Sequence, residues 1–183
     1  GFSIEGPGGL DTGGVHVGIS INGQNITVQG NTVSDVLTGI QTGSQYDTGS
    51  ATISGNTVSA EYGISLQNVD NTVSGNTITA TDEGLGIFGG MVNTVSGNIV
   101  TVTDGGEALA VYPNPDTSSE SVDIIASGNT VSVTEGATLQ NAVDLAGEGG
   151  TLDIGAGTYT EDIVIDSQIT LRGAQAGVGA RGR

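Results

Sequence analysis

Acidic side chains recur at one position of a repeated pattern, and they are the residues whose spacing could support chemistry. Each follows a Gly-Asn pair, five to seven residues after the glycine; the set is Asp35, Glu61, Asp82, Asp104 and Glu135. If the repeats stack, these carboxylates form a column of like charges about 5–10 Å apart, which costs energy unless solvent screens it or a cation intervenes. Ca²⁺ prefers several oxygen ligands, so Asp82 and Asp104 are the candidate calcium ligands. The simpler interpretation is a solvated acidic edge that discourages lateral aggregation.

The Gly-Asn pairs that precede these carboxylates mark an internal repeat. Their glycines follow one another at intervals of 25, 20, 22 and 31 residues, and the pairs occupy residues 30–31, 55–56, 75–76, 97–98 and 128–129. Periods near this length are typical of a solenoid with one turn per repeat, in which longer intervals carry loop insertions. We expect the pairs to be structural, with each Asn at a corner bonded to the Asn of the next coil.

Within each repeat, apolar and polar residues alternate with period two, which indicates strands. The residues expected to point inward are Ile53, Val58, Ile64, Leu66, Val73, Ile78, Leu85, Ile87, Val95, Val100 or Val102, Leu109 and Val111. The chain has 33 Gly, no Cys, no Trp and only 4 Tyr and 2 Phe, so Val, Ile and Leu must supply its core. Such a core suits short strands better than large helices.

These repeats resemble the right-handed parallel β-helix, or pectate-lyase-like, superfamily over nearly the whole chain. The resemblance implies an all-β solenoid with one short capping α-helix. It implies no single activity, because that superfamily includes lyases, hydrolases, epimerases, phage tailspikes and structural adhesins.

The C-terminal region has a different pattern. Leu139, Ala142, Val143 and Ala146 share one face of a predicted helix that Gly147 ends, and strands are expected at residues 152–154, 163–165 and 169–171. This segment resembles the N-terminal cap and first turns of many β-helix proteins, in which an Ile-Thr-Leu-Arg-Gly strand leads into a segment like GFSIEGPGG. Here that segment is residues 1–9. We therefore divide the chain into a body of five to six coils, residues 1–136, and a tail, residues 137–183.

Three explanations of this displaced cap stay open: one period of a tandem array, a circular permutant, or a subunit whose tail begins its neighbour's coil. The opening Gly1, in place of Met, indicates a processed or excised piece. We expect the tail to dock on the end formed by residues 1–21 of a neighbouring chain or of the same chain. Self-docking is strained, because about five coils span roughly 24 Å and residues 131–136 reach about 20 Å when extended. Docking on a neighbour is a heterologous contact that propagates into a filament.

Charge and composition limit the classes of binding partner and the location that we expect for this chain. The formal net charge is −17, with 20 Asp and Glu, and the only strong bases are Arg172, Arg181 and Arg183. Such a surface repels nucleic acids, and no apolar run of about 18 residues indicates membrane insertion. The acidic, Lys-free composition favours an extracellular or cell-surface location.

An enzymatic role is disfavoured. A lyase of this fold needs a basic residue on the flank of the coil, but the three arginines all lie in the tail. A hydrolase needs paired carboxylates at a defined separation; the chain has many carboxylates, but we expect no aromatic platform for sugar rings. His16 alternates with Val15 and Val17, so it is expected to face solvent. We therefore expect a non-catalytic structural protein, a subunit of a self-assembling surface filament or adhesin that binds itself head to tail. The alternative is a polysaccharide-active or glycan-binding β-helix protein.

Overall fold

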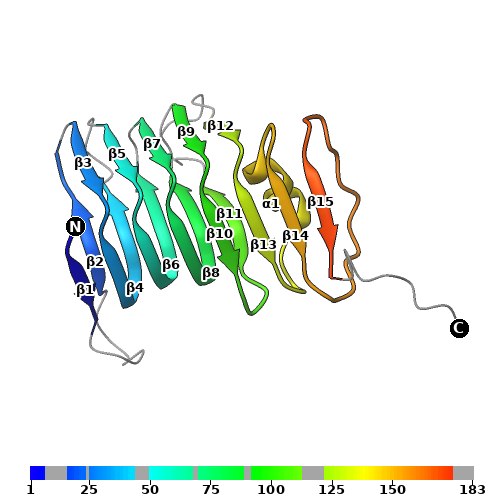
Figure 1. Ribbon diagram of the computed structural model, residues 1–183, viewed down its shortest axis with the longest axis horizontal. Coiled ribbons are helices and arrows are strands. Elements are labelled where there is room, and N and C mark those ends of the chain that lie inside the picture. The colour runs from blue at the N-terminus through cyan, green and yellow to red at the C-terminus, as the bar shows by residue number, and fades with distance from the viewer. Residues whose placement is uncertain are drawn as a thin grey trace, which may run out of the picture.

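The computed structural model describes residues 1–6, 16–23, 25–43, 50–67, 70–88, 92–112 and 122–174. These residues form a stack of coils that begins with β1 at one end and finishes with β15 at the other (Figure 1). The elements are β1 (Ser3–Glu5), β2 (Val17–Ile21), β3 (Ile26–Gln29), β4 (Thr32–Thr42), β5 (Ala51–Ser54), β6 (Thr57–Gln67), β7 (Asn71–Ser74), β8 (Thr77–Phe88), β9 (Val92–Ser96), β10 (Ile99–Val102), β11 (Glu107–Tyr112), β12 (Asp123–Ser127), β13 (Thr130–Val133), α1 (Leu139–Ala146), β14 (Thr151–Ile154) and β15 (Thr170–Gly173).

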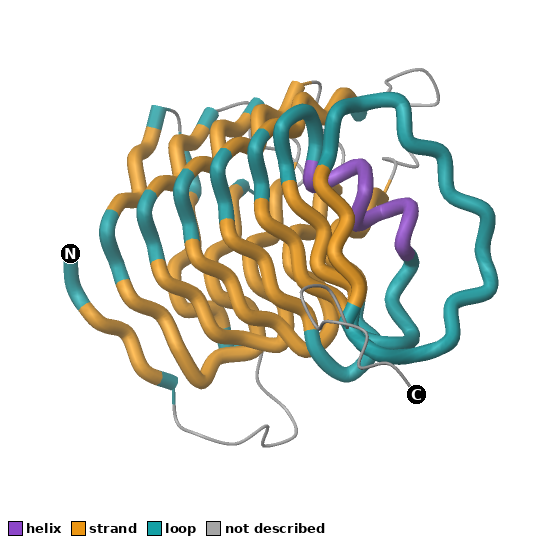
Figure 2. Tube along the Cα trace, turned by 45° about the vertical axis from the view of Figure 1, so that its right-hand side comes forward, coloured by secondary structure: helices purple, strands orange, loops and turns teal. Residues whose placement is uncertain are grey.

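All strand pairs in these residues are parallel, and they form two sheets. The larger sheet has the order β1-β4-β6-β8-β10-β13-β14-β15, with β2 beside β4 and β11 beside β8, and the smaller has the order β12-β9-β7-β5-β3. Successive coils lie directly over one another along the stack (Figure 2). The predicted all-β fold, a parallel β-helix with one short helix, is confirmed.

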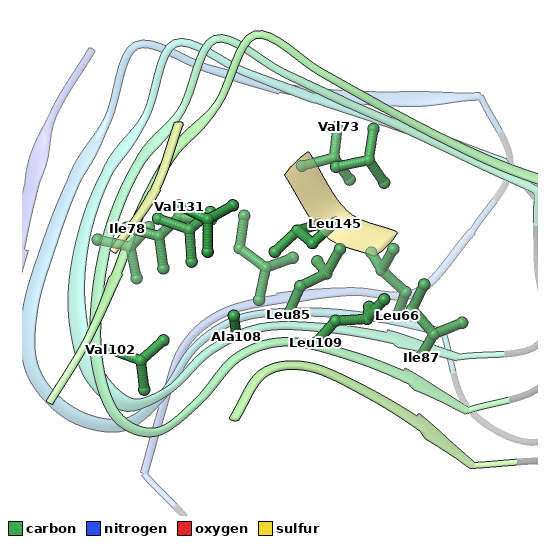
Figure 3. Packing of buried hydrophobic residues seen from close by; sticks show 14 of the residues in the cluster. Leu66, Val73, Ile78, Leu85, Ile87, Val102, Ala108, Leu109, Val131 and Leu145 are labelled. Carbon is green, nitrogen blue, oxygen red and sulfur yellow. The ribbon is translucent and has the colours of Figure 1, made fainter. Parts of the chain in front are cut away.

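The core is a set of stacked apolar rows inside the coil (Figure 3). Ile53, Val73 and Val95 are register partners on β5, β7 and β9, and each is at most 1% exposed. Val100 and Val102 are both buried, which resolves the alternative left by the sequence. Val111 lies in the inward column, as the register partner of the buried Ile87, but its side chain remains 43% exposed because β11 pairs only with β8 among the described strands.

The Gly-Asn corners are structural, as predicted. Each of the five glycines has a φ between 60° and 65°, a conformation that L side chains rarely adopt. Each asparagine is buried, and the backbone N–H and Nδ2 of one donate to Oδ1 of the next through Asn31, Asn56, Asn76, Asn98 and Asn129. The residue with left-handed backbone torsions at each corner is thus the glycine. The asparagine beside it forms these coil-to-coil hydrogen bonds, which we call the asparagine ladder.

Helix α1 closes the open end of the coil from inside. Its predicted apolar face, Leu139, Ala142, Val143 and Ala146, is buried, and Gly147 ends it with a φ of 63°. It packs against β11, β12, β13 and β14, and Asn129 Nδ2 ends the asparagine ladder on the carbonyl of Leu145 at 2.8 Å.

The tail continues the stack of its own chain. β14 pairs with β13 and β15 with β14, so the described part of the tail lies at the end opposite to β1 (Figure 1). The prediction of a strand at residues 163–165 is wrong. The Gln140 side chain accepts a hydrogen bond from the Val164 N–H and donates one to the Val164 carbonyl, so it occupies the backbone groups that a strand would use. Within the described residues the tail does not meet its own residues 1–21; docking on a neighbour's stays a prediction.

Candidate functional site

The acidic column lies at one corner of the coil, where the larger sheet bends. Irregularities in strand register fall at Asp35 in β4 and at Glu61 in β6, opposite Asp82. Asp35 and Asp104 have φ values of 57° and 58°, so the backbone itself turns at these carboxylates. The column therefore follows a bend that recurs on successive coils.

A calcium site at Asp82 and Asp104 stays a prediction. Among the described residues, no group of three or more His, Cys, Asp or Glu side chains is arranged to hold a metal ion. The Tyr62 hydroxyl instead interacts with the Asp82 carboxylate. That interaction, together with burial and the carboxylates nearby, raises the pKa of Tyr62 to about 12.

A second carboxylate cluster lies beside this corner, and no pattern in the sequence predicted it. Tyr62, Glu83 and Glu107 are register partners on β6, β8 and β11. Glu83 is only 8% exposed, and burial raises the pKa of its carboxyl, although the hydrogen bond that it accepts from the Tyr112 hydroxyl acts in the other direction. The same bond is the main reason that the pKa of Tyr112 rises to about 12.

An aromatic pair covers the same flank, which corrects the expectation that the chain has no aromatic platform. The rings of Phe88 and Tyr112 stack with centroids 4.4 Å apart and planes 11° apart. The two residues are register partners on β8 and β11, and each side chain is more than one third exposed. The flank therefore presents a partly exposed aromatic surface next to buried and exposed carboxylates.

Two carboxylates, Glu107 of that cluster and Glu161, bind the start of α1 and have a structural role. The Glu107 carboxylate accepts hydrogen bonds from the Thr138 hydroxyl at 2.7 Å, from the Thr138 backbone N–H at 3.3 Å and from Asn141 Nδ2 at 3.1 Å. Glu161 accepts from the backbone N–H of Leu139 at 2.7 Å. Helix N-termini favour negative charge and expose backbone N–H groups, so both carboxylates fasten the helix that closes the coil.

The two ends of the stack expose apolar side chains beside open strand edges. Phe2, next to β1, is 63% exposed, and Ile165 and Leu171 at the other end are each 43% exposed. Among the described strands, β1 and β15 each have a partner on one side only. Arg172 on β15 lies against Asp153 on β14, with Nε–Oδ1 and Nη2–Oδ2 distances of 2.5 Å and 2.6 Å.

The family model described as periplasmic copper-binding protein (NosD) matches residues 10–114, more than half of the chain. The chain belongs to the NosD family. This agrees with the right-handed parallel β-helix superfamily predicted from the repeats. No curated protein and no solved structure matches the chain.

The copper in the NosD description does not fit the residues of this chain. Protein copper sites favour imidazole, thiolate and thioether ligands, whereas this sequence has one His, one Met and no Cys. His16 is exposed, as predicted, and Met91 lies outside the described residues. Because the described residues also lack a metal-binding group, we derive no copper chemistry for this chain.

The family description also bears on location. NosD is described as periplasmic, which is consistent with a location outside the cytoplasm, the coarser part of the extracellular or cell-surface location expected from composition. Within the described residues, no helix has the length and hydropathy needed to cross a membrane.

Proposed function

We propose that this chain is a non-catalytic structural subunit of the cell envelope or cell surface that assembles head to tail with copies of itself. The observation that carries this proposal is the pair of open parallel edges at opposite ends of the stack, β1 and β15. Unpaired edges are templates for pairing with another chain, and many proteins cover or blunt them. Here each edge instead lies beside exposed apolar side chains.

The two ends differ in sequence and shape, so their contact is heterologous. A heterologous contact that does not close into a ring produces an open filament. Burial of a large apolar side chain stabilises by roughly 1.5–3 kcal/mol when complete, and Phe2, Ile165 and Leu171 would each contribute part of that amount. The net charge of −17 opposes association, so assembly should strengthen as added salt screens the repulsion.

Sedimentation velocity of the intact chain over a wide concentration range, at low and moderate salt, tests the proposal. We expect mass to grow with concentration without a fixed end point, and electron microscopy to show filaments. Replacing Ile165 and Leu171 with Asp should abolish growth while the circular dichroism of the body is retained. Ile99→Asp is the matched control, because Ile99 on β10 is 50% exposed on the flank, away from both ends. A strictly monomeric wild-type chain at high concentration would end the proposal.

A second candidate function, glycan binding, is favoured by the stacked pair of Phe88 and Tyr112 beside Glu83 and Asp82. Aromatic faces pack against sugar rings, and carboxylates accept hydrogen bonds from hydroxyl groups. The strongly acidic surface favours a neutral glycan over a uronate polymer. Calorimetry with neutral oligosaccharides should detect binding that Phe88→Ala removes. An unchanged affinity in that variant would exclude this flank.

A further inference from the structure

The larger sheet keeps one register from end to end, and this register relates the two terminal strands. Ile4 on β1 pairs with Val33, and the same column passes through Val58, Ile78, Val100, Val131 and Leu152 to Leu171 on β15. The adjacent column begins at Glu5 and passes through Ser34, Ser59, Thr79, Thr101, Ser132 and Asp153 to Arg172. Equivalent positions on the two terminal strands are therefore defined residue by residue.

The terminal residues of these columns are complementary. The apolar column ends in Ile4 at one end and Leu171 at the other. The polar column carries Ser or Thr through five coils and has charged residues only near its ends: Glu5 on β1, and Asp153 and Arg172 on β14 and β15. Arg172 is one of only three strong bases in the chain, and it is exposed at the outer edge. Its ion pair with Asp153 involves Nε and Nη2, whereas a guanidinium has five N–H donors in all.

We propose that a second copy of this chain docks by continuing this register, with β15 of one molecule against β1 of the next. Thr170 then pairs with Ser3, Leu171 stacks on Ile4, and Arg172 lies between its own Asp153 and Glu5 of the next copy. This inference rests on the proposed head-to-tail function and adds the partner strand, the register and the charged contact.

Other registers lose these contacts. A slip of one residue turns every side chain of a strand to the opposite face, so Leu171 would leave the apolar column. A slip of two residues keeps the faces but removes Arg172 from Glu5 and leaves one of the two apolar column ends without its partner. The in-register contact alone satisfies the apolar column and the charge column together.

Charge reversal tests the ionic contact. Glu5→Arg should weaken association about tenfold, as expected for replacing attraction with repulsion in a partly desolvated pair, although it lowers the magnitude of the net charge. Arg172→Glu should weaken it at least as much. The double variant should recover most of the loss, because Arg at position 5 then lies against the new carboxylate at position 172 of the neighbouring copy. Glu61→Arg, on the flank, is the matched control with the same change in net charge.

Disulfide trapping tests the register directly, because the chain contains no Cys. Adjacent paired strands place Cα atoms about 4.8 Å apart, within disulfide range, whereas a two-residue offset places them about 8 Å apart, beyond it. A chain carrying Ser3→Cys and Thr170→Cys should form covalent oligomers on mild oxidation. The control, Ser3→Cys with Gln168→Cys, should stay largely uncrosslinked.

The outcomes separate the two proposals. A wild-type chain that stays monomeric overturns the head-to-tail function, and this inference with it. A wild-type chain that assembles, but whose Glu5→Arg variant behaves like Glu61→Arg and whose control cysteines crosslink as readily as the in-register pair, overturns only the register. Charge rescue together with selective crosslinking of the Ser3 and Thr170 positions supports both.

Discussion

Asn76 lies in the middle of the asparagine ladder, and its replacement by Ala should strongly destabilise the solenoid. Its side chain is 1% exposed. The Asn76 Oδ1 accepts hydrogen bonds from the backbone N–H of Asn56 at 2.9 Å and from the Asn56 Nδ2 at 3.0 Å. Nδ2 donates to the carbonyl of Ile53 at 2.9 Å and to Asn98 Oδ1 at 3.0 Å. Alanine removes all four bonds at once.

The magnitude follows from the groups that lose a partner. The Nδ2 of Asn56 still reaches the carbonyl of Val28, and Asn98 Oδ1 still accepts from the backbone N–H of residue 76. The backbone N–H of Asn56 and the carbonyl of Ile53 lose a buried partner, at about 1–3 kcal/mol each. The free energy of unfolding should therefore fall by about 2–6 kcal/mol. With a urea m-value of about 2 kcal/mol/M, the midpoint falls by about 1–3 M.

Urea unfolding followed by circular dichroism measures this loss. Asn22→Ala is the matched control, because Asn22 is exposed and its side chain makes one long bond, 3.4 Å, to Ser20 Oγ. Its free energy of unfolding should change by no more than about 0.5 kcal/mol. Equal midpoints for the two variants would refute the inference that the ladder stabilises the coil.

Three further predictions concern the flank and the helix. In an ultraviolet titration, Tyr62 and Tyr112 should ionise near pH 12; because their folded pKa values are raised, the stability that they contribute is present below pH 10 and lost as pH rises toward 12. Tyr→Phe variants should remove these high-pH components, and two tyrosines that ionise near pH 10 would contradict the assignment. Glu107→Ala should lower the free energy of unfolding by about 1–3 kcal/mol in urea titrations, since it strips three donors at the start of α1; a change no larger than that of a surface variant would contradict this role. If Asp82 and Asp104 bind Ca²⁺, calorimetry should show binding that Asp82→Asn abolishes, whereas no heat at millimolar Ca²⁺ would leave a solvated acidic edge.

The sequence predicts the repeating body well because its signals are local. Alternation within a few residues identifies the inward row of Ile53, Val73 and Val95, and the recurring Gly-Asn pair fixes the corner of each coil. The helix is equally local, since its apolar spacing and Gly147 are both contiguous in sequence. These features need no knowledge of what lies above or below a given coil.

Contacts between coils were harder to predict, because insertions change the number of residues in each coil and so shift the register between coils. Phe88 follows Gly75 by 13 residues, whereas Tyr112 follows Gly97 by 15. Extra residues in the turn at Asp104 and Gly105 shift the count, so alignment on the Gly-Asn pairs does not reveal the stacked rings. Counting onward from that turn would have paired them.

The strand predicted at residues 163–165 failed for a different reason. The alternation there is genuine, but a polar side chain from α1 takes the backbone groups that a neighbouring strand would need. A pattern of apolar residues contains no information about such a competitor, because it comes from another segment of the chain.

The end-to-end order of the larger sheet has a consequence for how an assembly would look in bulk. Eight strands follow one another along its path, and at about 4.8 Å per strand each molecule advances the axis by about 38 Å. A filament of native subunits would therefore give the same meridional spacing, about 4.8 Å, that is used to recognise amyloid, with a longer period near 38 Å set by the repeat of whole subunits. Fibre diffraction would then report cross-β order in a material whose chains had never misfolded.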